Sequence, residues 1–509
     1  IFVYADNPYA ALDPNTIDPR IGNEEDFLEL SEALASKGIK VIIDLVPNHM
    51  SLKNNPWFND VLEKGQASEF ASFFSIRWSE LSGRVLLPIL LHSLKQELET
   101  QKLHLVKTKD SIYFSYNEFI LPLRKETMCE ASSLFEAIES RNQEPYFLGQ
   151  LLDKQHYKLT HFHDCIDEIN YRRFFNINDL IGLEINRPSV LTIHHRKAFN
   201  LLSEQKVFGA RIDHIDGLKY PAEYLKKIKE HAELVWVEKI LMPGEKLSRN
   251  WPVEGSVGYD FIHVLNGLFV PKEKQELMTH LYKEFIGDFV EFSQVAYESK
   301  KAFVQLQMSA ECLGLSRQIL ILYPDLGQSS SHVLLALVEF IAHLRVYRTY
   351  IEEGLRIEDQ IEIEEAVIKA KNTCPVVDPK LFDKIGSLLL TKEPSEDELE
   401  WITRLEQVSA TSMAKGLEDS AFFRYVRLIS LNEVGGDPGQ FGGDIETFHH
   451  FNQYKLKHYP LGALASSTHD TKLSEEARMK VNMLCHESDV WKAFLDSRER
   501  PLPIDANTA

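Results

Sequence analysis

Short apolar runs, rich in valine and isoleucine, recur along the chain, and polar or charged residues follow each of them. The clearest run, at 40–44, comes after an amphipathic segment at 24–36 that ends near Gly38. This order predicts a helix, a glycine at its C-terminal end and then a buried strand. Similar runs predict three more strands, at 207–213, 233–238 and, with the weakest pattern, 461–466. Buried strands with polar C-terminal ends are typical of a parallel sheet.

The intervals between these runs are too long for simple strand–helix–strand connections. About 160 residues separate the first two runs, and about 220 separate the last two. Most connections in compact domains are far shorter, so these intervals predict insertions. Between 272 and 427 the apolar residues recur at helical spacing, as at Leu334, Val338 and Ile341, which predicts a mainly helical segment.

Composition and charge narrow the class of protein. The 509 residues are 44% hydrophobic and 26% charged, which is close to the globular average. The net charge of −20 would repel a phosphate backbone, and no apolar stretch reaches the roughly 20 residues of a membrane span. We therefore expect neither a nucleic acid nor a membrane as partner.

The cysteines and the N-terminal residues indicate the cellular compartment. Five scattered cysteines with no CxxC pair predict neither a disulfide framework nor a zinc site, and we expect no cofactor or metal. No basic segment followed by an apolar segment opens the chain as given. A cytoplasmic location is the expectation.

Polar residues end each predicted strand, and in a parallel barrel such ends meet at one face. The four endings are Asp44 to His49, Arg211 with Asp213, Glu238, and His469 with Asp470. Any one of them alone is more often a helix cap or a structural ion pair. Together they predict a site in which several carboxylates, two histidines and an arginine converge.

This ordered set resembles the α-amylase family of glycoside hydrolases and transferases. The resemblance implies that Asp213 is a nucleophile, that Glu238 is a general acid and base, and that Asp470 stabilises charge at the anomeric carbon. Retaining glycosyl transfer needs two carboxyl groups about 5 to 5.5 Å apart in the first two roles. Arg211 lies two residues from Asp213, on the same face of the strand, where its charge would keep that carboxylate ionised.

Further motifs are similar to those of the maltooligosyl trehalose synthase family, and ordinary α-amylases lack most of them. They are found at 55–57, 170–175, 213–218, 244–245, 258–260, 265–269, 431–438 and 468–471. The resemblance implies conversion of the reducing-end α-1,4 bond of a maltooligosaccharide into an α,α-1,1 bond. The implied partners are maltooligosaccharides or linear α-1,4-glucan, with functional coupling to a trehalose-releasing hydrolase.

The resemblance also implies a set of side chains that contact the sugar. Its members are Asp44, His49, Arg211, His214, His469, Tyr9, Trp57, Phe174 and Tyr259. Isomerisation requires that water is excluded and the cleaved glucose retained, and the aromatic members suit an enclosed end of the cleft. For any single aromatic residue, packing in the core is the competing interpretation.

The expected fold is an α/β one, a (β/α)8 TIM-type barrel with large, mainly helical insertions, truncated at both ends. Barrel parts are expected at 1–75, 201–271 and 428–509, with an insertion containing a helical segment at 76–200 and a helical insertion at 272–427. Family members carry a His-Gly-Tyr-Asp turn where this chain has Asn7, Tyr9 and Ala10. Missing barrel strands would expose sheet edges.

Two other functions are consistent with these residues. One is a related α-glucan hydrolase of the same superfamily, such as an α-amylase or the trehalose-releasing enzyme. The other is a glucan-binding fragment without catalysis, which an incomplete barrel permits. Products formed from maltopentaose distinguish the first from a synthase, and binding without turnover identifies the second.

Overall fold

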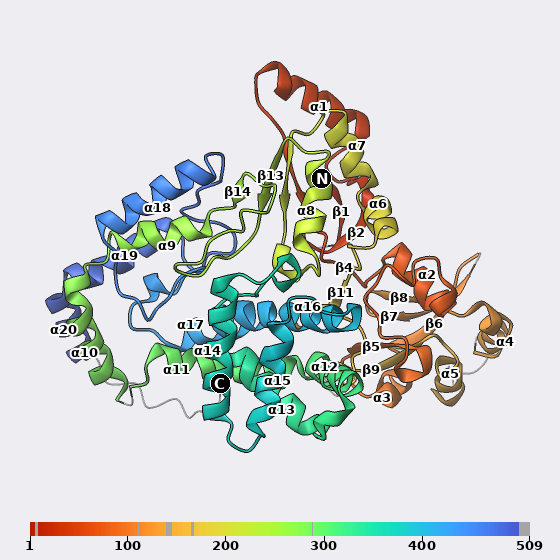
Figure 1. Ribbon diagram of the computed structural model, residues 1–509. Coiled ribbons are helices and arrows are strands. Elements are labelled where there is room, and N and C mark those ends of the chain that lie inside the picture. The colour runs from red at the N-terminus through yellow and green to blue at the C-terminus, as the bar shows by residue number, and fades with distance from the viewer. Residues whose placement is uncertain (6–8, 110, 139–144, 164–166, 288, 498–509) are drawn as a thin grey trace. The chain divides into compact units, whose positions relative to one another are not determined.

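The computed structural model describes all residues except 6–8, 110, 139–144, 164–166, 288 and 498–509 (Figure 1). The chain divides into two compact units, each assembled from three segments. Unit 1 consists of Ile1–Val235, Gln305–Leu334 and Ser395–Gln407. Unit 2 consists of Trp236–Val304, Leu335–Pro394 and Val408–Ala509.

Parallel strands of unit 1 position the N-terminal group of predicted site residues. Strand β3 (Ile42–Leu45) pairs with β12 (Gly209–Ile212), with Asp44 opposite Arg211. The amide of Glu233 donates to the carbonyl of Phe208 at 3.1 Å, next to the start of β13 (Leu234–Val237). The first three strands predicted from the sequence are thus confirmed, with bounds shifted by one or two residues.

The local signals around the first helix are also confirmed. Helix α1 (Glu24–Ser36) begins after Asn23, whose side chain accepts from the amide of Asp26 while the Asp26 side chain accepts from the amide of Asn23. This reciprocal capping satisfies two amides at the start of the helix. Gly38, with φ of 72°, follows the helix end in the left-handed region that glycine tolerates.

The fourth predicted strand is wrong. Residues 461–466 form no strand in the structure, and Leu461 and Leu464 are 61% and 55% exposed. One backbone hydrogen bond, from Ala463 to Ser256 at 3.2 Å, joins this segment to β14 (Gly255–Ser256). The alanines of the run are only partly buried and the leucines are exposed, so the pattern that indicated a strand reflects no buried sheet face here.

The remainder of unit 1 mixes short sheets with helices. Strands β4 (His49–Ser51), β11 (Ile177–Gly182) and β10 (Arg173–Phe174) form one antiparallel sheet. The other strands are β1 (Phe2–Tyr4), β2 (Ala11–Ile17), β5 (Val85–Leu90), β6 (Leu103–Lys107), β7 (Ile112–Tyr116), β8 (Phe119–Pro122) and β9 (Tyr157–His161). The helices that lie wholly within this unit, apart from α1, are α2 (Pro56–Lys64), α3 (Leu94–Glu99), α4 (Met128–Ile138), α5 (Pro145–Leu152), α6 (Pro188–His194), α7 (Arg196–Ser203), α8 (Pro221–Lys229) and α12 (Ser309–Leu322).

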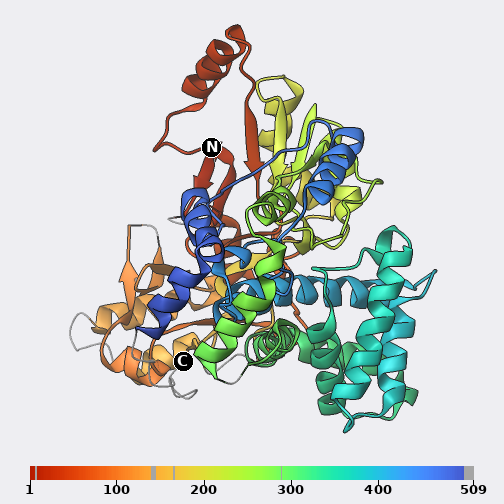
Figure 2. The same cartoon turned by 90° about the vertical axis from the view of Figure 1, so that its left-hand side faces the viewer.

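Unit 2 is mainly helical. Its short β14 pairs in parallel with the end of β13, joining Trp236 to Gly255 and Val237 to Ser256. Helices α14 (Ile357–Thr373) and α15 (Pro379–Leu389) pack side by side, as both views show (Figure 1 and Figure 2). The other helices wholly in unit 2 are α9 (Tyr259–Gly267), α10 (Gln275–Ile286), α17 (Phe422–Arg424), α18 (Ile445–His458), α19 (Glu475–His486) and α20 (Ser488–Asp496).

Three helices cross from one unit to the other along the chain. They are α11 (Phe292–Gln307), α13 (Ser330–His343) and α16 (Glu396–Thr411), after which a π-helical stretch spans Ser412–Ala421. The apolar spacing between 272 and 427 therefore predicted a helical segment correctly. Among the described residues, no helix is long and apolar enough to cross a membrane.

Candidate active site

The strand ends of unit 1 bring two predicted carboxylates to one arginine. Nη1 of Arg211 donates to Oδ1 of Asp44 at 2.7 Å and to Oδ1 of Asp213 at 3.1 Å. The backbone fixes this arrangement, because the amide of Asp213 donates to the carbonyl of Leu45 at 2.9 Å. A guanidinium between two carboxylates offsets their mutual repulsion, so both can remain charged next to each other.

Two tyrosines lie beside this group. The ring of Tyr9 is centred 5.9 Å from the guanidinium carbon of Arg211. Tyr4, in β1, escaped sequence analysis because its run carries no motif. Burial and the charges of Asp44 and Asp213 raise the pKa of Tyr4, so its hydroxyl stays protonated and neutral. Asn7 lies outside the described residues.

A ring cluster, formed by His49, Phe174 and His214, is also brought together in unit 1. The rings of His49 and Phe174 stack with centroids 4.0 Å apart, and His214 meets Phe174 edge-on at 5.2 Å. His49 is fully buried, and burial together with His214 and Arg172 lowers its pKa well below the usual range. Its imidazole is therefore neutral at physiological pH.

Trp57 lies in a different aromatic group. Its ring stacks on Phe70 at 5.4 Å and meets Phe73 and His194 edge-on at 5.5 and 6.1 Å. Asn55 holds the start of α2 by accepting from the Trp57 amide at 2.9 Å. Within the described residues, none of the ring contacts of Trp57 is with the ring cluster.

Unit 2 carries the second group of predicted residues. The hydroxyl of Tyr259 donates to Oδ2 of Asp470 at 2.9 Å and lies 3.0 Å from the hydroxyl of Thr468. Burial raises the pKa of Tyr259, and the charges of Asp470 and Glu238 raise it further, which places Glu238 in the same neighbourhood. Nε2 of His469 lies 3.3 Å from Oδ2 of Asp470.

Close packing of loops holds this second group. Gly258 has φ of 98°, and a Cβ there would lie 2.7 Å from the carbonyl oxygen of Ala463. Only glycine allows that approach at the start of α9. Buried Glu433 accepts from the amides of Lys472 and Leu473 at 2.7 and 3.3 Å, which fixes the chain just after Asp470.

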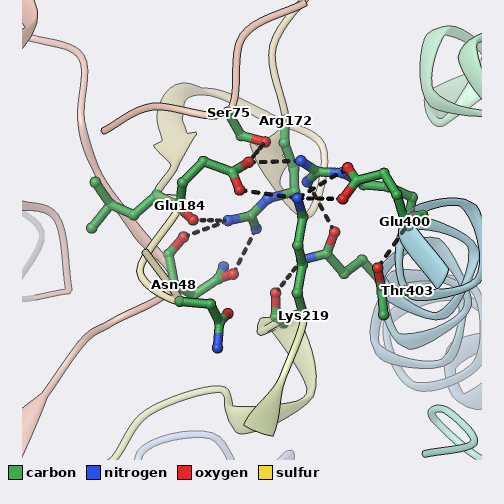
Figure 3. A network of polar contacts seen from close by, with 12 residues as sticks. Asn48, Ser75, Arg172, Glu184, Lys219, Glu400 and Thr403 are labelled. Atoms are coloured by element: carbon green, nitrogen blue, oxygen red, sulfur yellow. Dashed lines mark hydrogen bonds and ion pairs between the residues drawn. The ribbon is translucent and has the colours of Figure 1, made fainter. Parts of the chain in front are cut away.

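An ion-pair network that the sequence did not reveal lies in unit 1 (Figure 3). Glu184 accepts from Ser75 at 2.6 Å and pairs with Arg404 and Lys219 at 2.6 and 3.0 Å. Burial alone would raise the pKa of Glu184, but the charges of Arg404 and Lys219 outweigh it and hold the pKa well below its usual value. Lys219 and Arg404 also pair with Glu400 at 2.7 and 3.0 Å.

This network reaches the loop that follows Asp213. Gln407, in α16, donates to the carbonyl of Gly217 at 2.7 Å and accepts from Arg404 at 3.1 Å. These partners are distant in sequence, and only the motifs at 170–175 and 213–218 pointed to this region. Within the described residues, no group of three or more histidine, cysteine, aspartate or glutamate side chains is suited to hold a metal ion.

The chain is similar to known proteins in sequence and in structure. The family model for the alpha amylase catalytic domain matches residues 3–114 of this chain. A putative maltooligosyl trehalose synthase of Mycobacterium tuberculosis is 29% identical over 504 residues, which are 97% of this chain and 60% of that protein.

Solved structures give the same result. The maltooligosyltrehalose synthase from Arthrobacter ramosus is 31% identical with a TM-score of 0.84, covering 97% of this chain and 61% of that chain. A hypothetical maltooligosyl trehalose synthase of Sulfolobus tokodaii is 30% identical with a TM-score of 0.76 and the same coverage. The chain spans about three fifths of the length of these relatives. The expected TIM-type barrel with helical insertions is confirmed, and the chain resembles the maltooligosyl trehalose synthases of the α-amylase family, in sequence and in fold, over 97% of its length.

Proposed function

We propose that this chain catalyses the intramolecular transglycosylation that turns a maltooligosaccharide into a maltooligosyl trehalose. The reaction replaces the reducing-end α-1,4 bond by an α,α-1,1 bond, with retention at the transferred anomeric carbon. The observation that carries the proposal is the Asp44–Arg211–Asp213 group at the ends of β3 and β12. His214 of the ring cluster directly follows Asp213 in the sequence. The likeness to the synthases over 97% of the chain supports it.

In this proposal, Asp213 and Glu238 act as nucleophile and proton carrier. Asp213 attacks the anomeric carbon on the non-reducing side of the scissile bond and forms a glycosyl ester, while Glu238 protonates the oxygen of the leaving glucose. The glucose then turns over, and its anomeric hydroxyl attacks the ester while Glu238 takes up the proton. Asp213 leaves as a carboxylate, so atoms and charges balance.

The remaining residues bind and orient the sugar. Asp470, held by the Tyr259 hydroxyl at 2.9 Å, stabilises the positive charge that develops at the anomeric carbon. The ring cluster supplies an apolar face and a hydrogen-bond donor for the sugar ring. We further propose that the protein works in the cytoplasm and that a trehalose-releasing hydrolase uses its product.

Incubation with maltopentaose tests the proposal. Chromatography should show a product of unchanged mass, and reducing sugar should fall because both anomeric carbons of the new bond are blocked. A rise in reducing sugar would indicate a related α-glucan hydrolase instead. Binding of maltopentaose without turnover would identify a glucan-binding fragment.

A further inference from the structure

We propose that Arg172 is a positioning residue that sets the tautomer of His49 through the side chain of Asn48. In this arrangement the neutral imidazole of His49 carries its proton on Nε2 and offers that N–H as a donor. The inference rests on the proposed function in one respect, which is that His49 contacts the sugar. All three residues lie in unit 1.

The first step is the orientation of the Asn48 amide. Nη1 of Arg172 donates to Oδ1 of Asn48 at 2.6 Å, and Nη2 donates to the backbone carbonyls of Asn48 and Leu183, each at 2.9 Å (Figure 3). A guanidinium has donors and no acceptor, so the atom that faces it must be the amide oxygen. The amide NH2 of Asn48 therefore points away from Arg172.

The second step is the contact between the oriented Asn48 amide and the imidazole of His49. Nδ2 of Asn48 lies 3.4 Å from Nδ1 of His49. An amide nitrogen only donates, so Nδ1 must be the acceptor and must carry no proton. Because the low pKa of His49 keeps the ring neutral, the single ring proton is on Nε2.

The third step concerns the far side of the ring. Nε2 of His49 is buried and makes no hydrogen bond of regular geometry within the described residues. The backbone of Tyr9 favours the protonated ring, which is the effect of an acceptor near a ring N–H. Stacking on Phe174 already fixes the plane of the ring, so the position of its proton decides whether this edge donates or accepts.

Close packing restricts the side chains of both Arg172 and Asn48. A Cβ on Gly182 would lie 2.4 Å from the guanidinium of Arg172, and a Cβ on Gly217 would lie 2.6 Å from Oδ1 of Asn48. Glycine at both positions makes room for the two side chains. Burial and the charge of Arg404 lower the pKa of Arg172 to about 9, and the carboxylate of Glu184, fixed by its own ion pairs, opposes this shift. The guanidinium is therefore still charged at neutral pH.

Histidine labelled with nitrogen-15 in the ligand-free protein tests the inference directly. Protonated and unprotonated nitrogens of a neutral imidazole have well separated chemical shifts, and a His49→Gln variant identifies the resonances of His49. We expect Nδ1 to be unprotonated and Nε2 to be protonated. The opposite assignment in the wild-type protein would overturn the proposal, even if variants of Asn48 and Arg172 failed to fold.

Two variants test whether Asn48 and Arg172 set the tautomer of His49. Asn48→Asp places an acceptor opposite Nδ1, so the proton should move to Nδ1. Arg172→Lys keeps the charge but loses the fork that orients the amide, so the two tautomers should become mixed. Arg196→Lys, at the exposed start of α7, is the matched control and should leave the spectrum unchanged. An unchanged tautomer in folded Asn48→Asp and Arg172→Lys would refute the role of these residues.

Turnover of maltopentaose separates this inference from the proposed function. Asn48→Asp should lower kcat/KM about tenfold, the effect of one misdirected neutral hydrogen bond. The new carboxylate at position 48 should also raise the pKa of His49 above its wild-type value. The activity of this variant should therefore fall as pH drops through that pKa, unlike the activity of the wild type. A tautomer that shifts as expected in a protein without isomerase activity contradicts only the proposed function. An active wild type with the proton on Nδ1 contradicts only this inference.

Discussion

At the scale of single residues, the proposed chemistry depends on Asp213, which lies beside Arg211. Replacing Asp213 with asparagine keeps the shape of the side chain but removes the oxygen that forms the glycosyl ester. We expect isomerisation of maltopentaose to fall by at least roughly 10³-fold in Asp213→Asn. Asp496→Asn, at an exposed position in α20, is the control and should retain wild-type turnover. Comparable turnover in the two variants would remove Asp213 from the mechanism.

A second residue-scale prediction concerns Glu238. Glu238→Gln should bind maltopentaose with little change in Kd, as measured by calorimetry, while its turnover falls by roughly 10²-fold or more because no proton reaches the leaving glucose. A glycosyl fluoride needs no such proton, so formation of the ester should be partly restored with that substrate. Loss of binding in a folded variant would point to a structural role for Glu238.

Sequence reasoning predicted the proximity of residues that belong to one short motif. Arg211 and Asp213 lie two positions apart on one strand, so their proximity follows from strand geometry. Tyr4 and Glu184 could not be found in this way. Their partners are Asp44, Asp213, Lys219 and Arg404, which are distant in sequence and meet only through the tertiary fold.

At the scale of elements, strand β10 positions Phe174 beside a histidine of the proposed site. Because its ring covers His49, its loss should open the site to water, which competes with glucose for the ester on Asp213. We predict that Phe174→Ala raises released glucose severalfold relative to maltooligosyl trehalose while substrate is still consumed. Phe147→Ala, at an exposed position in α5, should keep the wild-type ratio. An unchanged product ratio in Phe174→Ala would show that Phe174 only packs.

The close contact of β12 with β13 predicts a stability effect. A Cβ on Gly209 would lie 2.4 Å from the carbonyl oxygen of Leu234, a backbone atom that cannot move alone. Gly209→Ala should therefore lower the free energy of unfolding by about 1–3 kcal/mol. Gly149→Ala, in helix α5 with its nearest contact at 3.9 Å, should be neutral or slightly stabilising. Equal denaturation midpoints for the two variants would contradict this packing.

Elements with local signals were predictable, and those that depend on neighbours were not. Helix α1 has its cap, its amphipathic face and its terminal glycine within 16 residues, so its bounds could be predicted from the sequence. The run at 461–466 has the composition of a strand, but its leucines are exposed and one backbone bond joins it to β14. Whether such a run forms a strand depends on partner strands that the pattern does not contain.

At the scale of the whole molecule, the return of distant segments to unit 1 could not be predicted. Segments 305–334 and 395–407 lie in the region predicted to be helical, yet they are compact with the first 235 residues. Buried Arg173 pairs with Glu311 at 3.1 Å, and Gln407 reaches Gly217. Such contacts join helices to motif residues more than 100 positions away, and helical periodicity says nothing about them.

The last prediction concerns how the stability of the molecule depends on pH. His194 and His195 are buried side by side in unit 1, with Nδ1 atoms 2.9 Å apart. Burial lowers the pKa of His194 to about 4, and burial with the neighbouring His194 lowers that of His195 well below its usual value. The folded state therefore resists protonation that the unfolded chain accepts near pH 6.5.

The sign follows from this difference in proton uptake. Between about pH 6.5 and 4 the unfolded chain binds more protons at these two histidines, so their contribution to the free energy of unfolding should fall as pH falls through this window. His194 alone contributes up to about 3 kcal/mol, because each pKa unit corresponds to about 1.4 kcal/mol. Carboxylates with lowered pKa values, such as Glu184, lose their contribution only below their ordinary value near 4.5. Burial raises the pKa of Glu418 from 4.5 to about 7, so this carboxyl acts in the opposite direction in the same window, and a comparison of variants is needed to isolate His194. In urea unfolding between pH 7.5 and 5, His194→Gln should remove the part of the slope that His194 contributes, whereas His280→Gln, 62% exposed at its side chain, should leave the slope unchanged. A slope that is the same in both variants would show that His194 is not responsible for the acid sensitivity.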